Sequence, residues 1–318
     1  MQDVQLAALG PVSFAESPLA SRVRFHQAWY RAAVLGIESY GSSVHGRVST
    51  PRGSILPAAA ALAGKNFTSD HAHQLYRERR SRGWGLDPTR CTAYLTSSQA
   101  LTLNIFGPLL NDKAWFACVL TDVLGTPVRE VLQAHIEHAP HRPSQALGDR
   151  TMLDVWVIAK TENGQNLSIA IEVKYSDRFS SRVLPIWANP KYREIANSQH
   201  PPLWNLDAPA SRTRAVNQLI RCHALCVFLA QEARATRSQL IVVHHPADSA
   251  AAAVIDEFDA IVDNGTLHPC GLDSFLLAMS RSANATQSRT VDELRTRYVA
   301  YHLSDALWER RGEATNGL

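Results

Sequence analysis

The stretch LSIAIEVKY, residues Leu167 to Tyr175, decides the fold and the candidate chemistry of this chain. Side chains alternate between the two faces of a β-strand. One face of this stretch is therefore continuously apolar, while the other carries Glu172 and Lys174 above small residues. A carboxylate and an amine would then stand side by side on the face opposite the core, where they could hold a divalent cation and steady a phosphate.

A second predicted strand, LDVWVIAK (residues 153–160), precedes this one and adds Asp154. The segment TENGQN between the two strands is a turn signal that allows two registers. A two-residue turn at Asn163-Gly164 would place Asp154 opposite Val173. The carboxylate would then point towards the core, away from the other charged groups.

A three-residue loop with glycine in the left-handed position would instead pair Thr161 with Gln165. Asp154 would then lie opposite Glu172 on the same face, with about 5 Å between the two Cβ atoms. We predict this second register, because only it brings the two carboxylates together.

Asp154, seventeen further residues and then Glu172-x-Lys174 form a pattern with a chemical meaning. Two carboxylates supply oxygen ligands for Mg²⁺, which takes its other ligands from water and substrate phosphates. Such a metal lowers the pKa of a bound water that attacks a phosphodiester. A nearby lysine can orient that water or stabilise the transition state. The pattern is short, and the same residues also fit a solvated strand face.

The spacing resembles the signature of the PD-(D/E)xK nuclease superfamily. The segment VREVLQAHIEHAP (residues 128–140) lies upstream and contains a third acid, Glu137. An acid before the Asp strand is frequent in these nucleases, where it helps to hold a metal. The resemblance therefore implies Glu137 as a third metal ligand beside Asp154 and Glu172.

Downstream, residues 211–233 predict a long helix with Ser211 as its N-cap. Gln218 and Arg221 are three residues apart on this helix, so they share one face. Another predicted strand, SQLIVVHHP (residues 238–246), follows the helix. The order strand, strand, strand, helix, strand is the core order of the superfamily fold.

The resemblance extends to a bacterial family classed as restriction endonucleases, and covers roughly residues 95–303. Its blocks occur in the same order: SSQALTLNIFGPL (97–109), the Glu137 segment, the Asp154 strand, IAIEVKYSD (169–177), NQLIRCHALC (217–226) and TRYVAYHL (296–303). The family implies Asp154, Glu172 and Lys174 as the catalytic set, with Glu137 and Gln218 as supporting members. Leu153 stands where the superfamily name has proline, which weakens the specificity of the match more than it argues against activity.

These patterns predict an α/β protein in three parts. Residues 1–120 form a mainly helical N-terminal extension, interrupted by a turn-rich segment at residues 41–54. Residues 121–248 form a restriction-endonuclease-like core, with a mixed four-stranded sheet flanked by helices. Residues 249–318 contribute C-terminal helices, near 271–282 and 290–302, that complete the same domain.

Composition is that of a globular protein, with 45% hydrophobic and 19% charged residues. No stretch is long and apolar enough for a transmembrane helix, and the first twenty residues lack the features of a signal peptide. Five cysteines without regular spacing argue against a disulfide framework. We therefore expect a cytoplasmic protein that makes no membrane contact. No GxGxxG, GxSxG or P-loop motif supports a dinucleotide enzyme, an α/β-hydrolase or an ATPase.

The charge distribution favours DNA as the partner. Residues 1–243 carry 26 Lys/Arg against 18 Asp/Glu, whereas residues 244–318 carry 6 against 11. Between Lys174 and Arg221 there are eight basic and three acidic residues. Clustered arginines suit contact with a phosphate backbone, although arginine-rich faces are more often simply solvated. We expect Arg178, Arg182 and Arg221 to contact nucleic acid.

Two functions remain open at this point. The first is a Mg²⁺-dependent endonuclease acting on DNA, with Mn²⁺ as a substitute metal and a role in restriction or defence against foreign DNA. Cleavage of both strands by one site per chain would favour a homodimer. The second is a non-catalytic DNA- or protein-binding module that retains the nuclease fold. A zinc site built from His135, His138 and His141 ranks well behind, because the spacing matches no helical zinc motif.

Overall fold

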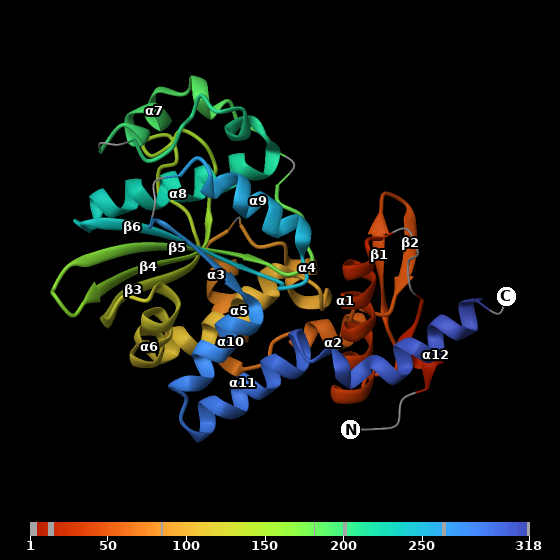
Figure 1. Ribbon diagram of the computed structural model, residues 1–318. Coiled ribbons are helices and arrows are strands. Elements are labelled where there is room, and N and C mark those ends of the chain that lie inside the picture. The colour runs from red at the N-terminus through yellow and green to blue at the C-terminus, as the bar shows by residue number, and fades with distance from the viewer. Residues whose placement is uncertain are drawn as a thin grey trace.

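A five-stranded mixed sheet positions the candidate site (Figure 1). The computed structural model describes residues 5–11, 16–83, 85–180, 182–199, 202–262 and 265–316. The strands lie in the order β3-β4-β5-β6-β7, in which β3, β4 and β5 are antiparallel and β5, β6 and β7 are parallel. Their bounds are Val128–His138 (β3), Leu153–Thr161 (β4), Asn166–Lys174 (β5), Arg237–His244 (β6) and Leu267–Gly271 (β7).

The prediction of a mixed α/β core is confirmed, but the count of four strands is wrong. The missing strand is β7, whose sequence LHPCG is short and contains Pro269. A proline cannot donate to the hydrogen-bond ladder and is therefore confined to edge strands. β7 lies at the edge of the sheet, which explains both why the strand forms and why its sequence does not resemble a central strand.

The predicted β4–β5 register is confirmed. Thr161 N donates to Gln165 O at 2.9 Å, and Gly164 has a φ of +83°, as the three-residue loop requires. Val155 pairs with Ile171, and in this register the next two residues to face each other are Asp154 and Glu172. The glycine of one turn thus decides that the two carboxylates share a face.

Helices cover both faces of the sheet (Figure 1). On one face lie α5, α6 and α10, and on the other lies α8. The helices are α1 (Pro18–Trp29), α2 (Ala58–Leu62), α3 (Asp70–Ser81), α4 (Pro88–Ala93), α5 (Ser98–Asn111), α6 (Lys113–Leu124), α7 (Pro190–Ala196), α8 (Arg214–Glu232), α9 (Ser249–Asp259), α10 (Leu272–Arg281), α11 (Ala285–Tyr298) and α12 (Asp305–Asn316). Short helical turns are η1 (Leu6–Leu9), η2 (Tyr30–Val34), η3 (Ile186–Ala188), η4 (Pro209–Arg212) and η5 (Tyr301–Ser304).

The face that carries Glu172 is itself packed, which corrects the expectation that it lies opposite the core. Ile169, Ile171 and Val173 pack into one apolar cluster with α5, α6 and α10, whereas Ala170 belongs to a second cluster with α8. The small residues below the charged pair therefore let a helix approach the sheet closely. Ser168 Oγ donates to the Cys226 carbonyl of that helix at 3.1 Å.

The long helix begins later than predicted. α8 starts at Arg214 with Thr213 as its N-cap, and no side chain caps it. Ser211, the predicted cap, lies in η4, and its hydroxyl donates to the carbonyls of Leu206 and Ala208 at 2.8 Å each. Its hydrogen-bonding capacity is used inside the preceding turn, so the helix is capped by backbone geometry alone.

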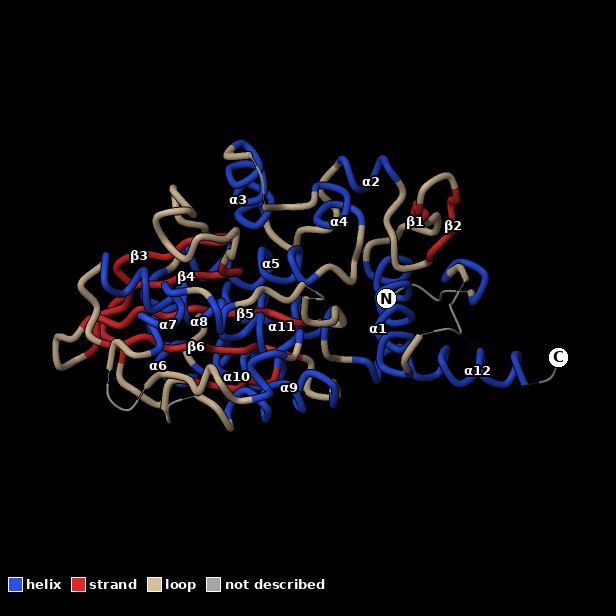
Figure 2. The backbone as a smooth tube through the Cα atoms, turned by 90° about the horizontal axis from the view of Figure 1, so that it is seen from above, coloured by secondary structure: helices blue, strands red, loops and turns tan. Residues whose placement is uncertain are grey.

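The N-terminal residues are less uniformly helical than predicted. The segment expected to be only turn-rich forms an antiparallel hairpin of β1 (Gly41–His45) and β2 (Val48–Arg52). Two perpendicular views show the hairpin, α1 and α12 together at one end of the molecule, away from β3 (Figures 1 and 2). In the described part of the chain, no helix combines the length and apolar character needed to cross a bilayer.

Candidate active site

Glu172 and Lys174, at the end of β5, form a buried ion pair. Lys174 Nζ lies 2.7 Å from Glu172 Oε1, and the two residues are 8% and 2% exposed. Burial opposes the charge of Lys174, but the carboxylates of Glu172 and Asp154 outweigh this effect and raise the pKa of the ammonium above its ordinary value. Lys174 is therefore a fixed positive charge at this site.

Asp154, on β4, provides the second carboxylate. It is half-buried, and one of its oxygens accepts a 2.8 Å hydrogen bond from Val173 N. Burial and the nearby charge of Glu172 raise the pKa of the Asp154 carboxyl to about 7. A carboxyl group whose ionisation is disfavoured in this way is one that a bound cation would stabilise in its charged form.

Glu137 reaches the same site from the end of β3 by a strained backbone. It has a φ of +49°, which is uncommon for a residue other than glycine. Its carboxylate is buried and accepts a bond from Gln99 Nε2 at 3.2 Å. Burial first, and then the charge of Asp154, raise the pKa of the Glu137 carboxyl. The structure thus places the three predicted acids within electrostatic reach of one another.

Gln218, on α8, connects the candidate site to a loop. Its Nε2 donates to Glu172 Oε1 at 2.6 Å, and its Oε1 accepts from Ser180 N at 2.5 Å. The amide therefore holds Glu172 and the segment after β5 in a fixed relation. The structure shows no direct hydrogen bond between Gln218 and Lys174 among the described contacts.

Cys222 also contacts Glu172, a contact that the sequence does not predict. Its Sγ donates to Glu172 Oε2 at 3.4 Å. Burial, followed by the charge of Glu172, raises the pKa of the Cys222 thiol, so the thiol keeps its proton and remains a donor. Residues 218, 222 and 226 are one helical turn apart, and Cys226 contacts Ser168 of the same strand. The i, i+4, i+8 spacing of these three residues is the feature of the sequence that could have indicated a helix face packed on β5.

The three predicted nucleic-acid contacts lie in different places. Arg178 and Arg182 are exposed. Arg221 is 8% exposed and donates to Asn217 Oδ1 and Thr151 Oγ1, both at 3.2 Å. Arg221 therefore uses these donors inside the protein, on the walls formed by Asn217 and Thr151.

The histidines of β3 form an aromatic stack. The rings of His135 and His138 lie 5.2 Å apart, and both pack against Trp156, at 5.7 and 4.6 Å. Strict alternation would place His135 and His138 on opposite faces, but the left-handed conformation of Glu137 breaks it. Ring packing therefore gives these two histidines a structural role.

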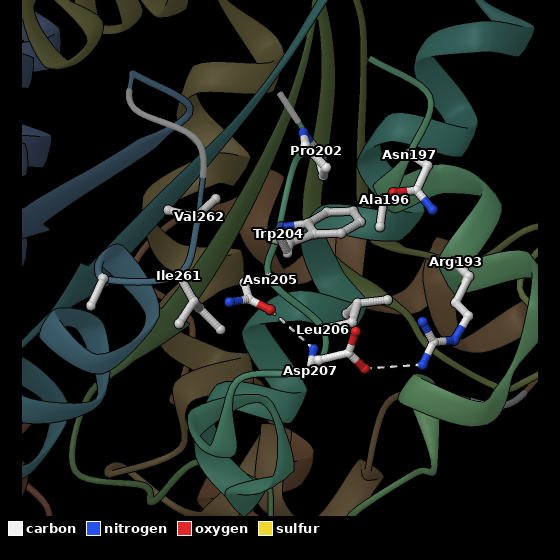
Figure 3. A pocket seen from close by; sticks show the side chains of 11 residues that line it. Arg193, Ala196, Asn197, Pro202, Trp204, Asn205, Leu206, Asp207, Ile261 and Val262 are labelled. Atoms are coloured by element: carbon white, nitrogen blue, oxygen red, sulfur yellow. Dashed lines mark hydrogen bonds and ion pairs between the residues drawn. The ribbon is translucent and has the colours of Figure 1, made fainter. Parts of the chain in front are cut away.

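The cavity of about 500 Å³ beside Trp204 lies outside the candidate site (Figure 3). Trp204 is 2% exposed and donates from Nε1 to His223 Nδ1 at 3.0 Å, so it anchors its loop and offers no open stacking face. The Arg193 guanidinium at the cavity is paired with Asp207 at 3.1 Å. None of the residues that line this cavity is one of the three acids Glu137, Asp154 and Glu172.

The donor set fits a hard divalent cation. Within the described residues, no three His, Cys, Asp or Glu side chains are gathered so as to hold a metal by themselves. Mg²⁺, however, is usually bound by one or two carboxylates and completed by waters and substrate phosphates. Asp154 and Glu172 supply such a pair, and a bound cation would offset the burial and the Glu172 charge that raise the pKa of Asp154.

One comparison with known proteins assigns the chain to a family. The model of the PD-(D/E)XK nuclease superfamily matches residues 15–300, which is most of the chain. No curated protein and no solved structure matches the chain. Nuclease activity is the general activity that this superfamily indicates. The chain therefore belongs to the PD-(D/E)XK nuclease superfamily.

Proposed function

We propose that this protein is a divalent-metal-dependent endonuclease that hydrolyses phosphodiester bonds in DNA, with Mg²⁺ as the metal and Mn²⁺ as a substitute. The observation that carries the proposal is the side-by-side arrangement of Asp154, Glu172 and Lys174 in one confirmed register. The basic residues near the site support a nucleic-acid substrate. A role in restriction or defence against foreign DNA, and a homodimeric state, stay predictions.

Each residue has a distinct part in the proposed reaction. Asp154 and Glu172 would hold the cation, with Glu137 as a third acid close by. When bound, the metal would supply Lewis acidity and an acidified water. Lys174 carries a positive charge that would stabilise the extra negative charge developing on the phosphate. Gln218 keeps the Glu172 carboxylate oriented through its bond to Oε1.

Supercoiled plasmid, linear duplex and single-stranded DNA, each incubated with Mg²⁺ or Mn²⁺, test the proposal. We expect cleavage that EDTA abolishes and that the Asp154→Asn variant and the double variant Glu172→Ala/Lys174→Ala lack. Glu162→Gln, which changes an exposed acid of the β4–β5 loop, is the matched control and should cut like the wild type. DNA binding without cleavage by any of these proteins would favour the non-catalytic module instead.

A further inference from the structure

A cavity of about 830 Å³ opens beside the candidate active site. Four segments far apart in the sequence line it: the start of α1, the segment Ser176–Ser180, the start of α8 and residues 247–254 around the start of α9. Its size lies within the range of about 300–1,000 Å³ that is typical of small-ligand sites. None of its lining residues belongs to the proposed catalytic set.

The cavity and the active site share a wall. The segment Ser176–Ser180 follows Lys174 almost directly, and the ring centroid of Phe179 lies 5.2 Å from Lys174 Nζ. At the end of the same segment, Ser180 N bonds to Gln218, which in turn bonds to Glu172. A ligand in the cavity would therefore lie next to the residues proposed to act on the phosphodiester.

Three acids and three arginines line the cavity, and the arginines without an ion-pair partner among the described residues are the groups open to a ligand. Its acids are already engaged: Asp177 pairs with Arg90 at 2.7 Å, Asp248 caps α9 through Ala251 N, and Glu16 pairs with Arg24 at 2.5 Å. Arg178 and Arg214 are exposed, and neither forms an ion pair with another described residue. Arg214 is also the first residue of α8, where the helix dipole adds further positive potential.

The cavity also has an apolar side, formed by Leu19, Phe179 and Val254. An aromatic ring and aliphatic side chains beside two guanidinium groups match the two parts of a nucleotide, since a base packs on apolar and aromatic surface while a phosphate binds arginine. The face of a base is free to pack on this apolar side only when the base is not stacked in a duplex.

We propose that this cavity is a subsite for one unpaired nucleotide of the substrate strand, with its phosphate on Arg178 and Arg214 and its base against the apolar side. The inference rests on the proposed nuclease function, because the cavity would bind the nucleotide next to the phosphodiester bond that is cleaved. It also gives the N-terminal helix α1 a part in substrate binding, and it predicts a preference for single-stranded or frayed DNA over intact duplex.

Binding of a fluorescein-labelled oligothymidylate and of a duplex of equal length, measured by anisotropy in EDTA across a salt series, tests the subsite without cleavage. The double variant Arg178→Ala/Arg214→Ala should bind the single strand at least about tenfold more weakly. Its log–log salt slope should fall by about 0.7 for each lost phosphate contact. Ala215→Trp, which fills the cavity and keeps both arginines, should weaken single-strand binding and leave duplex binding nearly unchanged.

Arg212→Ala is the matched control, because Arg212 is exposed and stacks on Trp187 at 5.4 Å outside the cavity. If Ala215→Trp does not fold, Ala250→Trp fills the cavity from the exposed start of α9. Wild-type single-strand affinity in the cavity variants, or an equal loss for both DNA forms, would overturn the subsite. A wild-type protein that cuts no DNA with any metal would overturn the nuclease proposal itself, which is a separate result.

Discussion

The Sγ atom of Cys222 lies 3.4 Å from Oε2 of Glu172. The other carboxylate oxygen, Oε1, is held by Lys174 and Gln218 at 2.7 and 2.6 Å. A thiol is a weak donor, so Oε2 is the oxygen that remains available to a cation, while the two stronger donors fix the orientation of the group. Cys222 contacts the oxygen that Lys174 and Gln218 leave free, so we infer that it helps to position this oxygen and acts only through Glu172.

We predict that Cys222→Ala weakens metal binding, because groups that orient a metal ligand typically contribute 10–100-fold to metal affinity. Since a thiol is a weak donor, we expect a loss of affinity of about 10-fold or less. Cys222→Ser, which restores a donor, should recover most of the loss. The measurement is the Mn²⁺ concentration that gives half-maximal cleavage, beside direct Mn²⁺ titration. Cys226→Ala, one turn along the helix, is the control, because the described bonds of its thiol go to Ser168 and to the backbone of β5 and β6. Unchanged Mn²⁺ affinity in Cys222→Ala would disprove the assignment.

Asp154 makes the stability of the metal-free protein depend on pH. Its folded-state pKa of about 7 is above its ordinary value of 3.8, so the folded state holds a proton that the unfolded state releases. The contribution of Asp154 to the free energy of unfolding is therefore largest below about pH 4. This contribution is lost as the pH rises towards 7, and each unit of pKa difference corresponds to roughly 1.4 kcal/mol.

The Asp154→Asn variant should therefore melt at a higher temperature than the wild type at pH 8 in EDTA, with a smaller difference at pH 5. Mg²⁺ should raise the melting temperature of the wild type and not that of the variant. Thermal unfolding followed by circular dichroism at both pH values, with and without Mg²⁺, measures both effects. A variant that is less stable than the wild type at pH 8 would contradict the raised pKa.

The register of β4 against β5 could be predicted from the sequence because it depends on a local turn. Gly164 takes the left-handed conformation at low cost, and the alternation of side chains then places Asp154 beside Glu172. The contact of Cys222 with Glu172 could not be predicted, because it depends on how α8 is rotated and translated relative to the sheet. Helical spacing indicates which residues share a face and does not indicate what that face meets.

The same distinction explains the other differences. Glu137 belongs to a predicted strand, but its positive φ is imposed by surrounding packing that no local pattern encodes. The proposed nucleotide subsite combines α1 with the starts of α8 and α9, which are brought together only by the complete fold. β7 was missed because Pro269 makes its sequence atypical of a strand.

Lys174 should have opposite effects on metal binding and on catalysis. Its ammonium lies 2.7 Å from Glu172 Oε1, where its charge repels a cation held at Oε2 of the same carboxylate, and it also supplies the charge proposed to stabilise the transition state. We predict that Lys174→Met binds Mn²⁺ at least as tightly as the wild type and cleaves DNA at least about 100-fold more slowly, as expected for loss of one electrostatic stabiliser. Calorimetric titration and single-turnover cleavage separate the two. Lys160→Met, on the partner strand β4, is the control, and weaker Mn²⁺ binding by Lys174→Met would contradict this charge repulsion.

His223 should make the protein sensitive to acid independently of the active site. Its Nδ1 accepts a hydrogen bond from Trp204 Nε1 at 3.0 Å, so the ring must be neutral, and burial lowers its pKa to about 3 from the ordinary 6.5. The unfolded state gains a proton first as the pH falls, and stability is therefore lost between pH 6.5 and 3, by roughly 1.4 kcal/mol per unit.

His26 and His245, whose pKa values burial lowers to about 4, contribute to the same acid destabilisation, so a single substitution removes only part of it. We predict that His223→Gln, which keeps an acceptor for Trp204 and cannot be protonated, reduces the loss of stability between pH 6.5 and 4 by a measurable fraction. Urea unfolding followed by tryptophan fluorescence at several pH values tests this. His71→Gln, at an exposed position of α3, should leave the pH dependence unchanged. An identical pH dependence in His223→Gln and the wild type would show that the ring is already charged in the folded protein, against the geometry of its bond to Trp204.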